Sequence, residues 1–262
     1  MKLWTLMENT TTRDDLACEH GLSLYIEAGD QRILFDAGQT GAFADNAEKM
    51  GIDLSKVDLC VLSHGHYDHG GGLKRFLEIN DHAPVYVNRH AFGDYFNGTE
   101  KYIGLDAAFL GEDRIIFAGD NRTISDTVSI HSCPNFPQPN GFSAYGLTAL
   151  RGGKHVPDDF RHEQYLLIRE GERRILLSGC SHRGVLNIKT WFAPDVFIGG
   201  FHLMKLDPEK DRIKLVAIAS MLMQKETVYY TGHCTGDAAY AFLKERMGDR
   251  LQALSTGASF EV

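Results

Sequence analysis

The stretch LSHGHYDHGGG, residues 62–72, decides the fold of this protein. It follows the apolar run VDLCVL at residues 57–62 and precedes GGLKRFLEI, which has the pattern of a helix. Four of its side chains, His64, His66, Asp68 and His69, carry imidazole or carboxylate groups, the ligands that zinc, iron and manganese accept. In an extended turn the first two can point one way and the last two the other way. One loop would then serve two metal ions.

Further histidines follow three other apolar runs, each typical of a buried strand. Cys180 and His182 come after RILLSG, His202 comes after DVFIGG, and His233 comes after TVYYTG. In an α/β fold, the carboxyl ends of such strands gather side chains from distant parts of the chain into one site. A solvated histidine-rich turn would have no such partners, so the sequence favours a metal site.

The order of the expected elements predicts one α/β domain over residues 1–262, a sandwich of two mixed sheets with helices outside. No linker, repeat or low-complexity stretch divides the chain. Residues 92–160 are expected to form an irregular, aromatic-rich insert. Expected strands span 2–8, 22–28, 31–35, 57–62, 84–87, 163–170, 173–179, 195–200, 227–232 and 250–254. Expected helices span 42–50, 71–79, 89–96, 185–192, 210–225 and 237–247.

Composition excludes several classes of protein. The 262 residues include 43% hydrophobic and 24% charged side chains, an ordinary globular balance. A net charge of −8 disfavours nucleic-acid binding, which needs a basic surface. The five cysteines are scattered and form no CxxC pair, which favours a reducing compartment. Without an apolar signal core at the N-terminus or an apolar run near the length of a membrane span, we expect a cytoplasmic protein that binds no membrane.

Several motifs resemble a known family. HGHYDH after a buried strand resembles the HxHxDH signature of the metallo-β-lactamase superfamily, and ILFDAG at 33–38 is similar to its LFDxG strand. Within that superfamily, the chain resembles the family named for dihydropterin-ribofuranosylaminobenzene-phosphate synthase. The motifs that carry this resemblance are EHGLS at 19–23, PDDF at 157–160, SGCSHRG at 178–184, GGFHL at 199–203 and TGHCTG at 231–236. The matches extend over about residues 5 to 240.

The resemblance implies an αββα fold with a metal site at one edge of the sandwich. It implies that His64 and His66 bind a first metal, and that Asp68, His69 and His233 bind a second. His182 is the preferred third ligand of the first metal, with His162 a weaker candidate. Cys180 stands where many members have a bridging aspartate, so it is either a soft group beside the metals or a ligand. Without that aspartate, we expect either a single occupied metal site or a second metal that is labile.

Several residues are expected to orient the metal ligands, to take part in the reaction or to contact the substrate. Asp36 is expected to orient a histidine ligand through a hydrogen bond. Asp68 would also hold the reacting water and accept its proton. His202 is left open as proton donor, substrate contact or packed residue, and Glu19 and His20 are candidates for substrate contacts.

Two functions follow from these residues and the resemblance. With one or two divalent ions, zinc first and iron or manganese as alternatives, the protein would be a hydrolase of small anionic, phosphoester-like substrates, because a bound metal lowers the pKa of water to about 7. The alternative is a transferase that joins a pterin to an aminobenzene ribofuranosyl phosphate. Aromatic side chains between residues 92 and 145 would stack on a planar ring. The expected partner is a small molecule, and assembly into a homo-oligomer is left open.

Overall fold

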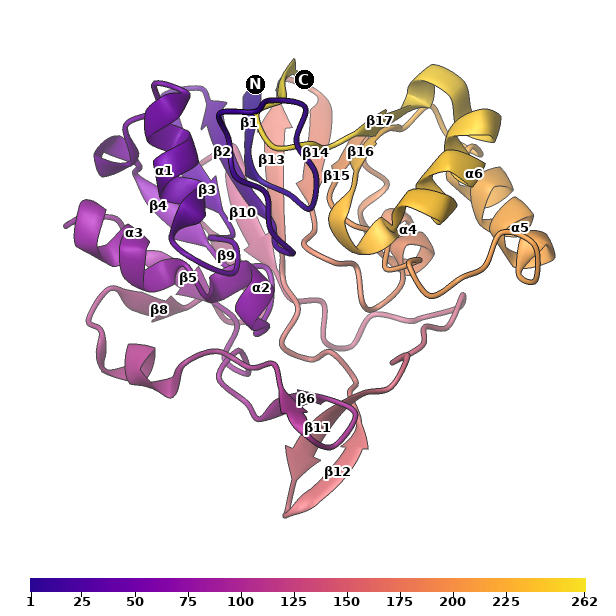
Figure 1. Ribbon diagram of the computed structural model, residues 1–262, viewed down its shortest axis with the longest axis horizontal. Helices are drawn as coiled ribbons and strands as arrows, with labels where there is room; N and C mark the ends of the chain where they lie inside the picture. The colour runs from indigo at the N-terminus through magenta and orange to yellow at the C-terminus, as the bar shows by residue number, and fades with distance from the viewer.

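A computed structural model describes residues 1–262 as three sheets and their helices (Figure 1). The first sheet has the order β18 (Ser259–Glu261), β1 (Lys2–Met7), β2 (Ser23–Ala28), β3 (Gln31–Phe35), β4 (Leu59–Val61), β5 (Val85–Val87) and β8 (Ile115–Phe117). The second has the order β17 (Leu251–Ala253), β16 (Val228–Thr231), β15 (Val196–Ile198), β14 (Arg173–Leu177), β13 (Tyr165–Glu170), β10 (Val128–His131) and β9 (Asn121–Thr123). A third, smaller sheet contains β12 (Lys154–Pro157), β11 (Leu147–Arg151), β6 (Tyr95–Asn97) and β7 (Lys101–Tyr102).

Helices cover the outer face of each large sheet. The first sheet is covered by α1 (Ala42–Lys49) and α3 (Leu73–Ile79), and the second by α4 (Val185–Phe192), α5 (Arg212–Leu222) and α6 (Asp237–Met247). The short helix α2 (Tyr67–Gly70) lies within the histidine loop, and 3₁₀ turns span 54–56, 107–111, 233–235 and 248–250. The layers are therefore α, β, β, α, as expected.

Three apolar layers hold this sandwich together. The central layer lies between the two sheets and contains side chains from both, such as Ile26 and Phe35 from the first and Ile168 and Ile198 from the second. The other two layers lie between each sheet and its helices. Because apolar burial is the main driving force of folding, these layers fix how the two sheets meet.

Each large sheet combines an antiparallel hairpin with a run of parallel strands. In the first sheet β2 pairs antiparallel with β3, and β3, β4 and β5 continue in parallel. In the second sheet β13 pairs antiparallel with β14, and β14 to β17 continue in parallel. The parallel strands of each sheet end at a common edge, where the histidine-bearing loops emerge. The turn expected at Gly29 and Asp30 joins β2 to β3, and Gly29 has a φ of 61°.

The region between residues 89 and 160 differs from expectation. The helix expected near 89–96 is wrong, since residues 95–97 form β6, which pairs with Leu147–Ala149 of β11. This pairing joins segments about fifty residues apart, and such a non-local partner overrides local helical preference. The small sheet that results projects from the sandwich in Figure 1. Within 97–160, β8, β9 and β10 extend the two large sheets.

A glycine in the histidine loop is required by close packing. A Cβ at Gly65 would lie 2.1 Å from the carbonyl oxygen of Ala91, so any side chain would force the two backbones apart. The absence of a side chain therefore lets the histidine loop lie directly against the backbone of Ala91.

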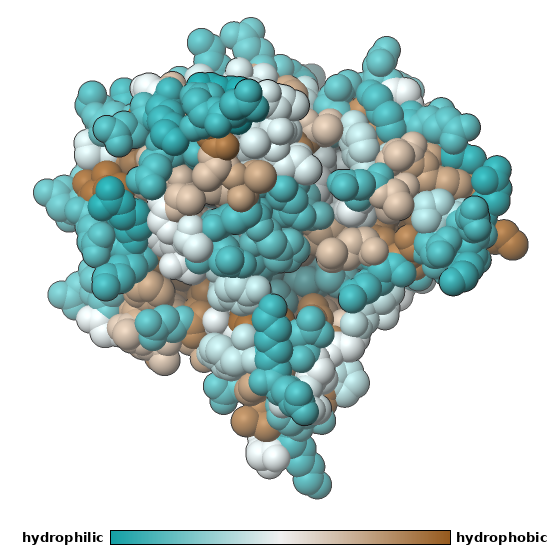
Figure 2. Space-filling view, in the orientation of Figure 1, coloured by the Kyte–Doolittle hydropathy of each residue, from teal (hydrophilic) through white to brown (hydrophobic).

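The outer surface is mostly polar. The face shown in Figure 2 is largely hydrophilic, with apolar side chains in scattered groups. None of the helices has both the length and the apolar composition that crossing a membrane requires.

A pair of identical substitutions tests the importance of the central layer. Ile26 is fully buried between the sheets, whereas Ile213 on α5 is 88% exposed. We expect Ile26→Ala to lower the free energy of unfolding by about 2–5 kcal/mol, because it removes buried methyl groups and leaves a cavity. Ile213→Ala should change it by less than about 0.5 kcal/mol. Urea denaturation measures both, and equal effects would contradict this view of the core.

Candidate metal centre

A change of backbone conformation divides the histidine loop into two parts. Ser63 to His66 continue beyond β4, and His66 is the extended N-cap residue of α2, with φ −105° and ψ 146°. Asp68 and His69 then lie in the helical turn, where the His69 N–H donates to the carbonyl oxygen of His66. The part before α2 bends at His64 and Gly65 and directs His64 and His66 toward one point, and the helical part directs Asp68 and His69 toward a neighbouring one.

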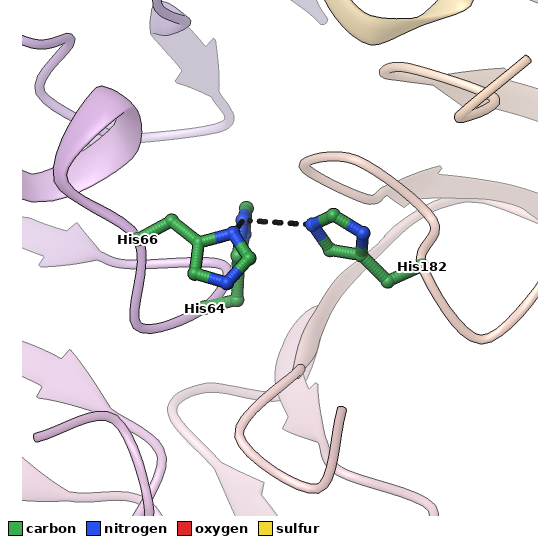
Figure 3. Close-up of side chains that lie close together, drawn as sticks. All are labelled: His64, His66 and His182. Atoms are coloured by element: carbon green, nitrogen blue, oxygen red, sulfur yellow. Dashed lines mark hydrogen bonds between the residues drawn. The ribbon is translucent and has the colours of Figure 1, made fainter. Parts of the chain in front are cut away.

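The first group of donors contains three imidazoles. His64 Nε2 lies 3.0 Å from His66 Nδ1 and 3.2 Å from His182 Nε2. Figure 3 shows His182 approaching from the opposite loop. Three ligand nitrogens held about 2.0–2.1 Å from a tetrahedral zinc ion are about 3.3 Å apart, so this spacing fits such an ion. Burial lowers the pKa of His66 to about 3 and those of His64 and His182 well below their usual range, which keeps these rings neutral and able to coordinate.

The second group contains Asp68, His69 and His233. His69 Nε2 lies 3.2 Å from His233 Nε2, and Asp68 Oδ2 lies 3.3 Å from His233 Nε2 and 3.7 Å from His69 Nε2. These spacings also fit one metal ion. Although burial opposes the charged imidazole, the carboxylates of Asp36 and Asp68 raise the pKa of His69 to about 9. A metal bound here would therefore replace a proton on His69.

Two further side chains border the second group. Cys180 Sγ lies 3.2 Å from His69 Nε2, and burial raises the pKa of its thiol well above the usual value. His20 Nε2 lies 3.5 Å from Asp68 Oδ2, and its ring lies 4.6 Å from that of His233. Both side chains are within reach of an ion at this position.

Hydrogen bonds on the far side of three rings orient their lone pairs. The Asp36 carboxylate accepts from His69 Nδ1 at 2.7 Å and from the Ser63 hydroxyl at 2.7 Å. Since that hydroxyl donates to Asp36, it accepts from His64 Nδ1 at 2.8 Å. The Asn9 side-chain oxygen similarly accepts from His233 Nδ1 at 2.9 Å. Each bond holds a proton on Nδ1 and directs the Nε2 lone pair toward the centre, the usual support for metal-binding histidines.

Other side chains in and around the centre lie just after the ends of other strands. His233 and His202 follow β16 and β15 with φ of 48° and 53°, and Asp36 follows β3 with φ of 59°. These left-handed turns are uncommon for residues with a side chain and project the groups across the sheet edge. His182 is held by its backbone N–H, which donates to Glu163 Oε1 at 2.8 Å, and by Phe160, whose ring stacks 4.4 Å away.

The weaker ligand candidate, His162, uses both of its ring nitrogens elsewhere. Its Nδ1 accepts from the Gly65 N–H at 3.0 Å, and its Nε2 donates to Asp158 Oδ2 at 3.0 Å. No lone pair of this ring remains for the first group. His162 instead holds the backbone of the loop that carries His64 and His66.

Of the remaining predicted residues, His202 lies beside the metal centre and Glu19 lies away from it. His202 lies beside the centre, with its ring 4.2 Å from that of His182, and neither of its ring nitrogens has a hydrogen-bond partner. Glu19 is not brought into the site. Its carboxylate accepts from the backbone N–H groups of Gln39 and Thr40, each at 2.9 Å, and so holds the loop before α1.

Both donor groups border one cavity of about 180 Å³. Tyr145, one of the aromatic side chains between residues 92 and 145 expected to stack on a ring, lines this cavity. Sequence reasoning missed Lys101 and Lys205, which also line it, and Glu8, which accepts from the His233 N–H. Isolated lysines and a glutamate at a strand end carry no motif, so no local signal identifies them. The two lysines bring positive charge to an otherwise acidic molecule.

Two comparisons with known proteins point to one superfamily. The model of the metallo-β-lactamase superfamily matches residues 16–106, which contain the histidine loop. A crystal structure described as a metal-dependent hydrolase of the β-lactamase superfamily superposes with a TM-score of 0.83 at 26% identity, covering 100% of this chain and 99% of that one.

Two relatives from Methanocaldococcus jannaschii match nearly the whole chain. One is named 7,8-dihydropterin-6-methyl-4-(β-D-ribofuranosyl)-aminobenzene-5′-phosphate synthase. It is 29% identical, and the match covers 98% of this chain and 95% of the relative. The other, an uncharacterised protein, is also 29% identical over 92% of this chain and 93% of its own.

The two candidates for the third ligand can be separated by metal analysis. We expect His182→Ala to lower the metal content by about one equivalent per chain, because the first group loses one of its three imidazoles. Cys180→Ser should leave the content nearly unchanged. Elemental analysis of proteins purified without chelators measures both. Loss of metal from the Cys180 variant alone would transfer the ligand role to the thiol.

Proposed function

We propose that the chain is a member of the metallo-β-lactamase superfamily and a metal-dependent hydrolase of small anionic, phosphoester-like substrates. The observation that carries the proposal is the pair of adjoining donor groups on one cavity. The ring centroids of His64, in the first group, and His69, in the second, are 4.1 Å apart. Because the two donor groups adjoin, ions held by them would act on the same substrate.

We propose that His64, His66 and His182 hold the first divalent ion, and that Asp68, His69 and His233 hold the second. Zinc suits these mixed nitrogen and oxygen donors and the nearby thiol of Cys180, and iron and manganese are the alternatives. When bound, such an ion lowers the pKa of water and polarises a phosphoryl oxygen. Asp36 keeps the imidazoles of His64 and His69 in place through its hydrogen bonds.

We assign separate roles in the reaction to the side chains around the ions. His69 and His233 lower the pKa of Asp68 despite its burial, so its carboxylate stays ionised and is suited to orient the attacking water. We propose that it also accepts the proton of that water. Lys101 and Lys205 attract the anionic group of the substrate into the cavity. His202 also lines the cavity, and its free ring nitrogens suit it to give a proton to the departing oxygen.

The rest of the molecule favours a small substrate. With a net charge of −8, the surface repels an extended polyanion, while a small anion still enters the cationic cavity. We therefore propose a small-molecule partner and neither nucleic acid nor membrane. The cytoplasm is the compartment we propose, on the basis of the scattered cysteines.

A transferase is the second candidate, supported by the full-length match to the M. jannaschii synthase. In that case the same centre would activate a leaving group on a pterin, and an aminobenzene ribofuranosyl phosphate would take the place of water. Product analysis separates the two reactions. A hydrolase releases phosphate or an alcohol from one substrate, whereas a transferase consumes two substrates and forms a larger product.

The basic test combines metal loading with hydrolysis of phosphate monoesters and diesters. We expect about one to two equivalents of metal per chain, turnover of small phosphoesters and weak competitive inhibition by inorganic phosphate. His66→Ala should reduce activity by orders of magnitude, whereas His82→Ala, at an exposed histidine outside the cavity, should not. Protein that neither binds metal nor gains activity when metals are added would overturn the metalloenzyme proposal.

The role of His202 predicts a dependence on the leaving group. We expect His202→Gln to lower kcat by about 10²-fold or more for alkyl phosphates, whose alkoxide needs a proton to depart. The loss should be much smaller for nitrophenyl phosphate, whose phenolate departs unaided. Steady-state kinetics on the two substrates, with metal content as the control, measures the difference. An equal loss on both would assign His202 to positioning.

A further inference from the structure

A second cavity, of about 390 Å³, adjoins the metal cavity and shares His182, His202 and Tyr145 with it. Its other walls come from the loop at residues 140–145 and from helices α4 and α5. Most of this lining is apolar, and it includes Phe142, Val185, Leu186, Phe201 and Ile218. The chemistry proposed above uses none of these apolar side chains.

We propose that this cavity binds the planar, aromatic part of the substrate while its phosphate lies at the metal centre. This inference rests on the proposed function. An apolar pocket next to reactive groups is the common form of a small-molecule site, and its volume accommodates one aromatic ring system. The ring of Tyr145 offers a face for stacking.

His202 lies at the boundary between the two cavities. Its ring centroid is 4.2 Å from that of His182 and 5.4 Å from that of Tyr145. A substrate that spans both cavities therefore places the bond between its phosphate and its ring beside His202. This position connects recognition of the ring with protonation of the departing oxygen, which a leaving group less acidic than nitrophenol needs.

Lys214 supplies the one formal charge in the lining of the second cavity. Its Nζ lies 3.3 Å from Tyr145 Oη, so it stands at the wall that Tyr145 forms. A lysine ammonium there pairs with an acidic group on the far side of the ring. The structure therefore favours an aryl phosphate that also carries a carboxylate or a second phosphate.

Binding of non-hydrolysable phosphonates tests the aromatic site separately from catalysis. Calorimetric titration of zinc-loaded protein compares phenylphosphonate with methylphosphonate. Burial of the phenyl ring should tighten binding by about 10- to 100-fold over methylphosphonate. Equal affinities for the two, or no binding of phenylphosphonate, would overturn the proposal.

Two substitutions on α5 locate the ring. Ala217 is exposed to solvent but also lines the second cavity, so Ala217→Trp fills the cavity without disturbing the core. Ser220 is exposed on the same helix outside that lining. We expect Ala217→Trp to remove the preference for phenylphosphonate and Ser220→Trp to keep it, with methylphosphonate bound equally by both. A preference that survives Ala217→Trp would place the ring elsewhere.

The lysine is tested with 4-carboxyphenylphosphonate. We expect wild-type protein to bind it about three- to tenfold more tightly than phenylphosphonate, since an exposed ion pair contributes modestly. Lys214→Gln should remove this gain, and Lys210→Gln, at an exposed lysine outside the cavity, should retain it. A gain that persists in Lys214→Gln would overturn the role of Lys214.

These experiments distinguish a failure of the proposed hydrolase function from a failure of the proposed aromatic site. If no phosphoester is hydrolysed but phenylphosphonate binds with the expected preference, hydrolysis is wrong and the aromatic site stands. If phosphoesters are hydrolysed and the ring gives no preference, the hydrolase stands and the aromatic site is wrong.

Discussion

The buried carboxylate of Asp36 is the interaction on which the candidate centre depends. It is fully inaccessible to solvent and accepts hydrogen bonds from the backbone and hydroxyl of Ser63 and from His69 Nδ1, all at 2.7 Å. A buried carboxylate without such partners would be costly, so the end of β3 and the loop after β4 hold one another in place. Because the bonds pass to His69 directly and to His64 through Ser63, one side chain orients a donor in each group.

The two halves of the sandwich make complementary contributions to this centre. The first sheet supplies His64, His66, Asp68 and His69 from a single loop, which is held rigidly by Asp36 and His162. The second sheet supplies its donors from separate loops at the ends of its parallel strands. The apolar layer between the sheets brings these loops together, and its packing therefore determines the distances within the site.

The charge of the cavities differs in sign from the net charge of the molecule. The chain as a whole carries a net charge of −8, while lysines border both cavities. Such a contrast draws a small anion inward and turns large polyanions away. The adjoining apolar cavity would add a second criterion, since we propose that it binds the ring of an aromatic anion. Together these properties would let the proposed centre select one kind of substrate.

By itself, the sequence determined the class of fold and the types of donor. The order of apolar strands and helices indicated an α/β sandwich of two mixed sheets, and the loop at residues 62–72 keeps four donors within six residues. Both signals are local. Tertiary structure alone decided the rest. The spacing of residues leaves His162, Cys180 and His182 all open as third ligand, because it does not show where a lone pair points. Packing turns both nitrogens of His162 to other partners and brings His182 Nε2 to His64. Likewise, β6 pairs with a strand about fifty residues away, and the second cavity forms between distant helices. Such contacts depend on how the layers pack, which no local pattern records.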